Sequence, residues 1–461
     1  MKTENLNSQS WPAGAPEILL TDTSRWPCAA RIAIGLSQVG GSVSALCPTR
    51  GHPLLKTSVV RRTFPYSGVR PLDSLVSAIE ATKPQIVIPC DDRAVEHLHE
   101  LYARSRNLGQ PGRDIAALIE RSLGSPESFP IVSSRIDLLR IAREEGLRVA
   151  DTNLINAAED LRSWSARQKL PWVLKADGTA GGRGVKIAGT AGQAQKYFME
   201  LSGLFGSARA IKRLIINRDP FWLRPWWNGT RPPVIVQSYI HGRPANCAVA
   251  CWDGRVLAGI GVEVVNTAGP TEPANIVRVV DSPEMMFAAE RIARRLRLSG
   301  LFGLDFMINE SGEAYLIELN PRATPLCHLQ LGQGRDMIGA LWAQLSGQPV
   351  REIPPITQNE VIAYFPQASK CQSEFLKSTF YDIPQGEPDL IQELLSPWPD
   401  RTLLVQACNR ADTALRTLRG LLTPFGINNV DKASLTYTAL PASVATDGEV
   451  PHQSAAKTTC P

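Results

Sequence analysis

The chain has 461 residues, of which 43% are hydrophobic and 20% charged, and its net charge is +5. The composition is that of a globular protein with roughly two to four folding units, and no apolar run is long enough to span a bilayer. The mild charge, without a long lysine and arginine block, argues against nucleic acid as a partner. A secretion signal is also missing, so the expected location is the cytoplasm.

Cysteine and histidine patterns give little support to a metal site built on sulfur or nitrogen. The nine cysteines include no CxxC pair, and the six histidines form no HExxH motif. The same pattern favours reduced thiols over a disulfide framework. Oxygen ligands therefore remain the candidates for any metal.

The N-terminal part alternates strands and helices. This alternation predicts a parallel sheet in a Rossmann-like domain over residues 15–125. No GxGxxG motif follows the first strand, so a dinucleotide has no local support there. The expected strands are 17–22, 42–48 and 85–92, and the expected helices are 31–41, 74–84 and 94–105.

From residue 126 the pattern changes to isolated helices and hairpins. A serine-capped helix is expected over 133–147, and strands over 171–178 and 234–240. Hairpins are expected over 247–265, turning at Asp253-Gly254, and over 302–320, turning near Ser311-Gly312, with a helix over 282–298 between them. A smaller segment follows from about residue 355, and the last twenty or so residues are expected to be disordered.

The hairpin over 302–320 carries the most informative polar residues. Asp305 lies on its first strand, and Glu318 and Asn320 lie two residues apart on one face of the second. Carboxylate and amide oxygens suit Mg²⁺, which completes its shell with substrate phosphates. Arg322 would add positive charge opposite a transferring phosphoryl group. The alternative is a set of ordinary polar residues beside a turn, which is costly inside apolar strands.

A glycine-rich loop forms the second candidate site. In VLKADGTAGGRGVKI, Lys175 ends a strand, and the glycines that follow can bring backbone N–H groups against phosphate oxygens. Those glycines are Gly178, Gly181, Gly182 and Gly184. A flexible hairpin is the alternative interpretation, and the segment is not a P-loop because GxxxxGK[ST] is absent.

These two segments, in this order, resemble those of the ATP-grasp superfamily, which includes D-alanine:D-alanine ligase, biotin carboxylase and the large subunit of carbamoyl-phosphate synthase. DFMINESGEAYLIELNPR is similar to that family's magnesium strand pair. The resemblance implies that Asp305, Glu318 and Asn320 bind Mg²⁺, with Mn²⁺ as an alternative, and that Arg322 acts on the γ-phosphate. It also implies nucleotide contacts from Arg135, Lys175, Gly178, Thr179, Gly181, Gly182, Gly184 and Val185.

The segment that would contact adenine departs from the family pattern. In VIVQSYIHGRPANCAV, Gln237 stands where the family commonly has glutamate, and Pro244 stands at the ribose-binding glutamate. The Gln237 side chain can still accept from the adenine amino group, and the backbone of Tyr239 and Ile240 can contact the purine edge.

The resemblance implies an α/β fold, α+β in its grasp region, and assigns domains to the chain. After the Rossmann-like domain these are linker helices (126–170), a lid subdomain (171–240), a core with the metal site (241–350), a C-terminal subdomain (355–440) and a tail (441–461).

The implied activity is ligation of a carboxylate to an amine through an acyl phosphate, with ATP and Mg²⁺ as cofactors. Small molecules are the expected partners, an amino acid among them, and a homodimer is the family expectation. The alternatives are a carboxylase or carbamoyl-transfer enzyme and a non-catalytic ATP-binding protein. A tryptophan-rich insertion over 217–233 is expected to contact substrate, to contact a partner or to pack within the lid. His328 is expected either to approach the acceptor pocket or to cap a helix.

Overall fold

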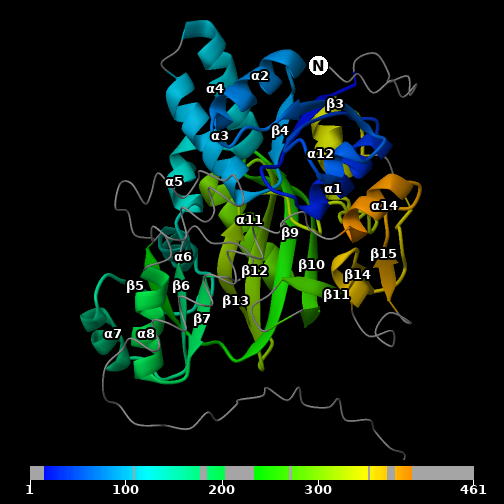
Figure 1. Ribbon diagram of the computed structural model, residues 1–461. Helices are drawn as coiled ribbons and strands as arrows, with labels where there is room; N and C mark the ends of the chain where they lie inside the picture. The colour runs from blue at the N-terminus through cyan, green and yellow to red at the C-terminus, as the bar shows by residue number, and fades with distance from the viewer. Residues whose placement is uncertain are drawn as a thin grey trace, which may run out of the picture. The chain divides into compact units, whose positions relative to one another are not determined.

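The computed structural model describes most of the chain between residues 15 and 396. The chain divides into residues 1–406 and residues 407–461, and every described residue lies in the first part. The strands there form three sheets, and Figure 1 labels strands from each of them. The described ranges are 15–106, 109–176, 184–202, 233–267, 269, 273–350, 354–370 and 379–396.

The first sheet contains four parallel strands in the order β3-β2-β1-β4. Strands and helices alternate along this part of the chain, which confirms the parallel α/β architecture predicted from the sequence. Because β2 and β4 flank β1 on opposite sides, strand order reverses at the carboxyl ends of β1 and β4. The elements are β1 (Glu17–Thr21), α1 (Pro27–Gln38), β2 (Ser42–Cys47), η1 (Pro53–Leu55), β3 (Val60–Pro65), α2 (Pro71–Thr82), β4 (Ile86–Pro89), α3 (Asp92–Ser105) and α4 (Gly109–Leu123).

Strand β3, the short η1 and helix α4 are not among the elements predicted for this part of the chain. β3 is an edge strand with the sequence VRRTFP, and Arg61, Arg62 and Thr63 are exposed. An exposed edge strand lacks the apolar alternation that identifies a half-buried strand, and charged residues are common at such edges.

The second sheet is antiparallel, with the order β5-β8-β6-β7. Helices α7 and α8 pack on it, and Trp172 and Leu174 lie in the core between them. Lys175 on β6 pairs with Val185 on β7 and Ile235 on β8. The elements are β5 (Thr152–Ile155), α7 (Ala158–Ser165), β6 (Trp172–Ala176), β7 (Val185–Ala188), α8 (Ala191–Ser202) and β8 (Val234–Ser238).

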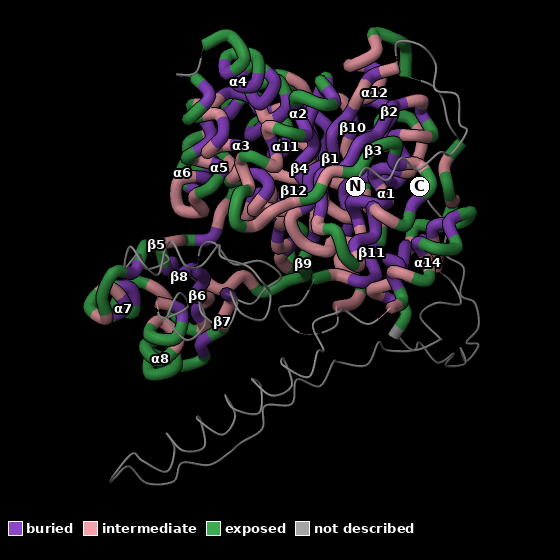
Figure 2. Tube along the Cα trace, turned by 45° about the horizontal axis from the view of Figure 1, so that its top comes forward, coloured by how far each residue is buried: buried purple, intermediate pink, exposed green. Residues whose placement is uncertain are grey.

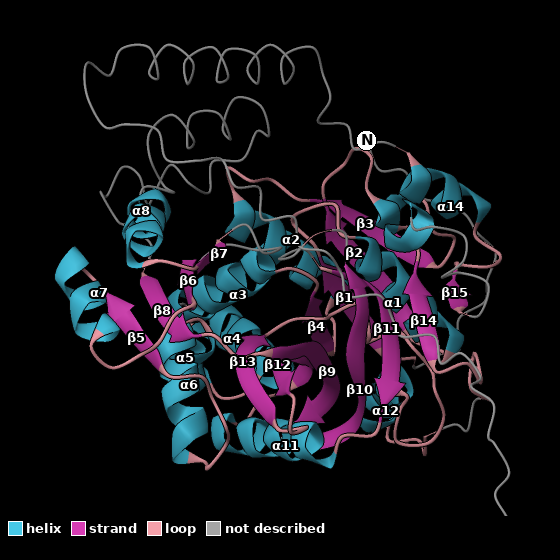
Figure 3. Ribbon diagram, turned by 90° about the horizontal axis from the view of Figure 1, so that it is seen from below, coloured by secondary structure: helices cyan, strands magenta, loops and turns pink. Residues whose placement is uncertain are grey.

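The third sheet contains seven strands, several of which lie side by side in Figure 3, in the order β13-β12-β9-β10-β11-β14-β15. Both predicted hairpins are present. The first turns at Asp253-Gly254, where both residues have positive φ, as a two-residue hairpin turn requires, and Gly312 with φ of 83° lies in the second turn. The strands are β9 (Gly242–Trp252), β10 (Arg255–Thr267), β11 (Ala274–Val280), β12 (Gly300–Asn309), β13 (Ala314–Asn320), β14 (Val361–Tyr364) and β15 (Phe380–Asp382).

Helices around this sheet begin where serine or aspartate caps them. Ser134 caps α6, as predicted, and Ser282 caps α11, each through a side-chain oxygen that accepts a backbone N–H. α6 packs on β13, and α11 packs on β9 and β10. Figure 2 shows buried residues concentrated along the strands, whereas α7 and α8 carry exposed ones. The remaining elements are η2 (Pro126–Ser128), α5 (Phe129–Val132), α6 (Arg135–Glu144), α11 (Pro283–Leu296), α12 (Met337–Ser346), η4 (Gln367–Lys370) and α14 (Pro388–Leu395).

Helix α14 is attached to the N-terminal sheet through charged groups. The guanidinium of Arg25 pairs with Glu393 at 2.6 Å, and the carboxylate of Glu387 accepts from the Ser58 hydroxyl at 2.6 Å. No helix in the described part of the chain is both long enough and apolar enough to cross a membrane.

Candidate functional site

Asp305 and Glu318 lie directly opposite each other on β12 and β13. Asn320, two residues further along β13, lies opposite Gly303, so the three side chains share one face of the hairpin. Asn246 on the neighbouring strand β9 pairs with Asp305 in register, and its side-chain Nδ2 donates to the Asp305 carboxylate at 2.6 Å. Four oxygen-bearing side chains from three adjacent strands therefore meet at one point.

The two carboxylates differ in their electrostatic surroundings. Burial, together with the charge of Glu318, raises the pKa of Asp305 to about 6, although hydrogen bonds from Asn246 and Asn320 act in the opposite direction. The pKa of Glu318 is lowered despite its burial, because the charges of Arg135, Lys175 and Arg322 favour the carboxylate. One carboxylate is thus held ionised by cations while its neighbour resists ionisation.

Two of those cations come from other parts of the fold. Arg135, the first residue of α6, donates from Nη2 to the Glu318 carboxylate at 2.6 Å and from Nη1 to the backbone carbonyl of Ala176 at 3.3 Å. Lys175 on β6 is 6% exposed, and its charge acts on Glu318. The structure therefore brings Arg135 and Lys175 to the β12–β13 hairpin at Glu318.

The third cation, Arg322, is fixed by three hydrogen bonds. Its Nε donates to the Asp92 carboxylate at 2.8 Å, its Nη2 to the Asn320 side-chain oxygen at 3.2 Å and its Nη1 to the Ala323 carbonyl at 3.3 Å. The guanidinium carbon lies 6.0 Å from the centre of the Trp26 ring. Arg322 therefore lies beside the β12–β13 hairpin and also contacts Asp92, the first residue of α3, and Trp26, which precedes α1.

The donor set fits a hard divalent cation. Asp305 and Glu318 supply carboxylate oxygens and Asn320 an amide oxygen, which is the ligand chemistry of Mg²⁺. Within the described ranges no three His, Cys, Asp or Glu side chains form a metal-binding group. Two protein carboxylates suit Mg²⁺, which usually takes one or two of them together with substrate phosphates.

The residues expected at the adenine lie on β8 and just after it, and β8 belongs to a different sheet from the strands that carry Asp305 and Glu318. Gln237 is 1% exposed, and its Nε2 donates to the Thr152 hydroxyl oxygen at 2.9 Å. Tyr239 and Ile240 follow β8 and are partly buried, with Tyr239 packed edge-on against His241. No contact described for Gln237 joins it to Asp305 or Glu318. Pro244 lies on β9 and pairs with Met307 on β12.

Only the end of the glycine-rich loop belongs to the described part of the chain. Gly184 accepts the N–H of Ala176 through its carbonyl at 3.0 Å, and Val185 begins β7 opposite Lys175. The expected phosphate contacts Gly178, Thr179, Gly181 and Gly182 lie outside the described residues, as does the tryptophan-rich insertion up to residue 232.

Sequence reasoning does not find Asn246 or Asp92, although each leaves a signal. Asn246 is a polar residue within an apolar strand, and Asp92 belongs to an acidic pair that directly follows a buried strand. The expectation that His328 caps a helix is wrong. Its Nε2 lies 2.6 Å from the Asp382 carboxylate on β15 and 3.4 Å from Nε of Arg31 on α1, and the next helix, α12, is capped by Asp336.

Comparisons with known proteins place this geometry in context. Residues 226–325 match the family model described as an ATP-grasp domain. No curated protein sequence matches the chain.

Three solved structures are similar in fold. The biotin carboxylase domain of 2-oxoglutarate carboxylase from Hydrogenobacter thermophilus, solved with MgADP and bicarbonate, has a TM-score of 0.52 at 15% identity and covers 73% of this chain and 71% of its own. The N5-carboxyaminoimidazole ribonucleotide synthetase of Thermus thermophilus has a TM-score of 0.52 at 14% identity, covering 73% and 80%. The L-amino acid ligase of Bacillus licheniformis has a TM-score of 0.51 at 13% identity, covering 74% and 76%. At these identities the similarity defines the fold.

Proposed function

We propose that this chain, which belongs to the ATP-grasp superfamily, is an ATP-dependent ligase that joins a carboxylate to an amine through an acyl phosphate. The observation that carries the proposal is the opposed pair Asp305 and Glu318 with Asn320, surrounded by three cations from three parts of the fold. Such a pair is costly without a cation, and the surrounding positive charge suits a polyphosphate.

The reaction balances without a covalent enzyme intermediate. A substrate carboxylate oxygen attacks the γ-phosphorus of ATP, the bond to the β-phosphate oxygen breaks, and ADP leaves. The amine nitrogen then attacks the acyl carbon, the carbon–oxygen bond to phosphate breaks, and the amine proton passes to solvent. Catalysis on this route is mainly positional and electrostatic.

Each cation has a distinct part in this proposal. Lys175 and Arg135 bind the phosphates of the nucleotide, and Arg322 neutralises the charge that develops on the transferring phosphoryl group. Asp305, Glu318 and Asn320 hold Mg²⁺, which supplies charge neutralisation to the triphosphate. Val185 and the glycine loop before it cover the phosphates and exclude water from the acyl phosphate.

Buried thiols near the site are poor nucleophiles, which is consistent with this route. Burial raises the pKa of Cys247 to about 12 and also raises the pKa values of Cys28 and Cys327. A thiolate is the reactive form of cysteine, so none of the three is activated at neutral pH.

A second candidate function is ATP binding without turnover. The observation that favours it is Gln237, whose side-chain N–H already bonds Thr152 where the family commonly places a glutamate. Carboxyphosphate chemistry is a further alternative within the fold, and it requires bicarbonate.

A phosphate-release screen separates these functions. Purified protein is mixed with MgATP and pairs of amino acids and small carboxylates, with a parallel arm containing bicarbonate. Release that needs a carboxylate and an amine together supports the ligase, and release that needs bicarbonate supports carboxyphosphate chemistry. Asp305→Ala and Glu318→Ala should abolish release, while the exposed control Asp281→Ala should not. MgATP binding without release in any arm would favour the non-catalytic function, and full activity in either site variant would refute the metal assignment.

The proposal also specifies partners. The substrates are a small carboxylate and an amine, one of them an amino acid, and the tryptophan-rich insertion over 217–233 contacts substrate or a partner. The chain forms a homodimer, which light scattering of the purified protein tests.

A further inference from the structure

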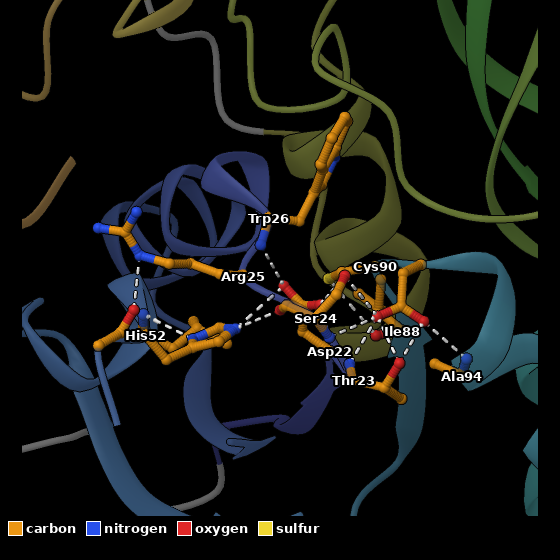
Figure 4. A network of polar contacts seen from close by, with 12 residues as sticks. Asp22, Thr23, Ser24, Arg25, Trp26, His52, Ile88, Cys90 and Ala94 are labelled. Carbon is orange, nitrogen blue, oxygen red and sulfur yellow. Dashed lines mark hydrogen bonds and ion pairs between the residues drawn. The ribbon is translucent and has the colours of Figure 1, made fainter. Parts of the chain in front are cut away.

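The carboxyl edge of the N-terminal sheet contains a dense polar network. In open parallel sheets, ligands bind in the crevice where strand order reverses, which here is the carboxyl ends of β1 and β4. Asp22, Thr23 and Ser24 follow β1, and Asp91 and Asp92 follow β4. Figure 4 shows Asp22, Thr23 and Ser24 directed into one network, with His52 on one side and Ala94 of α3 on the other.

The members of this network form hydrogen bonds with one another. The Asp91 carboxylate accepts from the Thr23 hydroxyl at 2.9 Å, from the Ser24 N–H at 3.0 Å and from the Ala94 N–H at 2.8 Å. The same Ser24 N–H also donates to the carboxylate of Asp22, two residues earlier in the turn, at 3.0 Å. The backbone N–H groups of Thr23, Ser24 and Ala94 are therefore already bonded to the Asp91 carboxylate and are not open to a phosphate or carboxylate ligand.

The segment that follows the metal strand docks against the same edge. The N–H of Ala323 donates to the carbonyl of Pro89, the last residue of β4, at 3.0 Å. One residue earlier, Arg322 pairs with Asp92 at 2.8 Å and lies over the ring of Trp26, which precedes α1. In this protein Arg322, the arginine of the proposed phosphoryl-transfer site, therefore lies at the carboxyl ends of β1 and β4, where an open parallel sheet would bind a ligand.

Asp92 and Asn320 together set the direction of the guanidinium. The planar guanidinium of Arg322 has five N–H donors. Its hydrogen bonds to Asp92, Asn320 and Ala323 use one donor on each of its three nitrogens. Asn320 is itself a candidate metal ligand, so Asp92 is the partner of Arg322 that has no other part in the site. The Arg322 side chain is 14% exposed and that of Asp92 is 45% exposed, so Asp92 lies at the open side of the pair.

We propose that Asp92 is a positioning residue that holds Arg322 in the orientation required for phosphoryl transfer. The N-terminal domain thereby sets the geometry of the phosphoryl-transfer site through Asp92 of α3, while the proposed nucleotide contacts come from α6 and the other two sheets. The inference rests on the proposed function, because Arg322 needs a transferring phosphoryl group to act on.

The test compares Asp92→Ala with Asp92→Glu, which keeps the carboxylate, and with Asp73→Ala. Asp73 is an exposed acid in the first turn of α2, so its removal reproduces the loss of an acidic residue at a helix N-terminus without touching Arg322. Misplacement of a phosphoryl-contacting group by about 1 Å costs about 100-fold in rate. We expect kcat to fall about 10- to 100-fold in Asp92→Ala, to recover in part in Asp92→Glu and to stay unchanged in Asp73→Ala.

Two further measurements distinguish positioning from folding and from failure of the proposed function. MgADP affinity should be unchanged in Asp92→Ala, whereas the tightening of MgADP binding by aluminium fluoride, a mimic of the transferring phosphoryl group, should be lost. Unchanged kcat and unchanged aluminium fluoride response would overturn the inference alone. Loss of MgADP affinity together with a lowered unfolding temperature would overturn it in favour of a structural role. Absence of MgADP binding by the parent protein would overturn the proposed function and this inference with it.

Discussion

Replacing Asp305 by asparagine should stabilise the nucleotide-free protein while removing its response to MgATP. Asp305 lies opposite Glu318, and burial and this neighbour raise its pKa from 3.8 to about 6. An acid whose pKa is higher in the folded protein than in the unfolded chain stabilises the fold through its bound proton. This contribution to the unfolding free energy is fully present below the unfolded-state pKa near 3.8 and is lost as pH rises through about 6. At neutral pH the ionised side chain therefore opposes folding.

The size of the effect follows from the same shift. At 1.36 kcal/mol per pKa unit, a pKa raised from 3.8 to about 6 corresponds to about 3 kcal/mol. An asparagine loses about 1 kcal/mol of this gain, because Asn246 and Asn320 both donate to the carboxylate and an amide accepts through one oxygen. Asp305 is only partly buried, so solvent screening reduces the gain further, to about 1 to 2 kcal/mol.

Thermal unfolding followed by fluorescence, with and without MgATP, measures both halves of the prediction. The unfolding temperature of the nucleotide-free protein should rise in Asp305→Asn. MgATP at 100 times its Kd should raise the unfolding free energy of the parent by about 3 kcal/mol, and this stabilisation should shrink or disappear in the variant. Asp281→Asn is the control, since its side chain is 87% exposed and pairs only with Arg335 among the described contacts. A nucleotide-free midpoint below that of the parent would refute the reasoning, because Asp305 would then stabilise the fold.

Three further predictions concern other described residues. Lys175→Met, which keeps the apolar stem and loses the charge, should weaken MgATP binding about 10- to 100-fold by calorimetry, and unchanged affinity would remove Lys175 from the nucleotide site. Gln237→Glu should destabilise the protein by about 1 to 3 kcal/mol in urea. The reason is that the Thr152 hydroxyl already donates its proton to the Ala150 carbonyl at 2.9 Å, so its oxygen lone pairs would face the new carboxylate. A variant as stable as the parent would contradict this hydrogen-bond network. Burial is the main reason that the pKa of Asp22 is raised to about 7; Asp91 raises it further, and His52 lowers it. The unfolding free energy should therefore fall as pH rises through about 7. In Asp22→Asn the unfolding free energy should depend less on pH in this range. If the unfolding free energy of the parent does not decline there, the raised pKa of Asp22 is refuted.

The β12–β13 hairpin that carries Asp305 and Glu318 could be predicted because all the information is local. Alternation in FGLDFMIN and AYLIELN fixes which side chains share a face, and Gly312 marks the turn between them. Asp305 and Glu318 are therefore opposite each other in the structure as the pattern indicates. Three strands of the parallel N-terminal sheet are predictable for the same reason, since β1, β2 and β4 are buried apolar runs separated by amphipathic helices.

The contacts that complete the site could not be predicted, because they join distant parts of the chain. Asp92 and Arg322 are 230 residues apart, and Arg135 and Glu318 are 183 apart. Neither pair has a periodicity or spacing that would reveal it, and the packing of three sheets decides which acid meets which arginine. Asn246 is intermediate, since its polar side chain within an apolar strand marks a site without identifying Asp305 as its partner.

The central claim is that a substrate carboxylate takes the γ-phosphoryl group of ATP. It is tested most directly by giving the protein MgATP, an amine and a carboxylate labelled with ¹⁸O in both oxygens, and measuring the mass of the released phosphate. The account predicts one ¹⁸O atom transferred to each phosphate. Phosphate released without label would contradict it, since ATP would then be hydrolysed by water and no acyl phosphate would have formed.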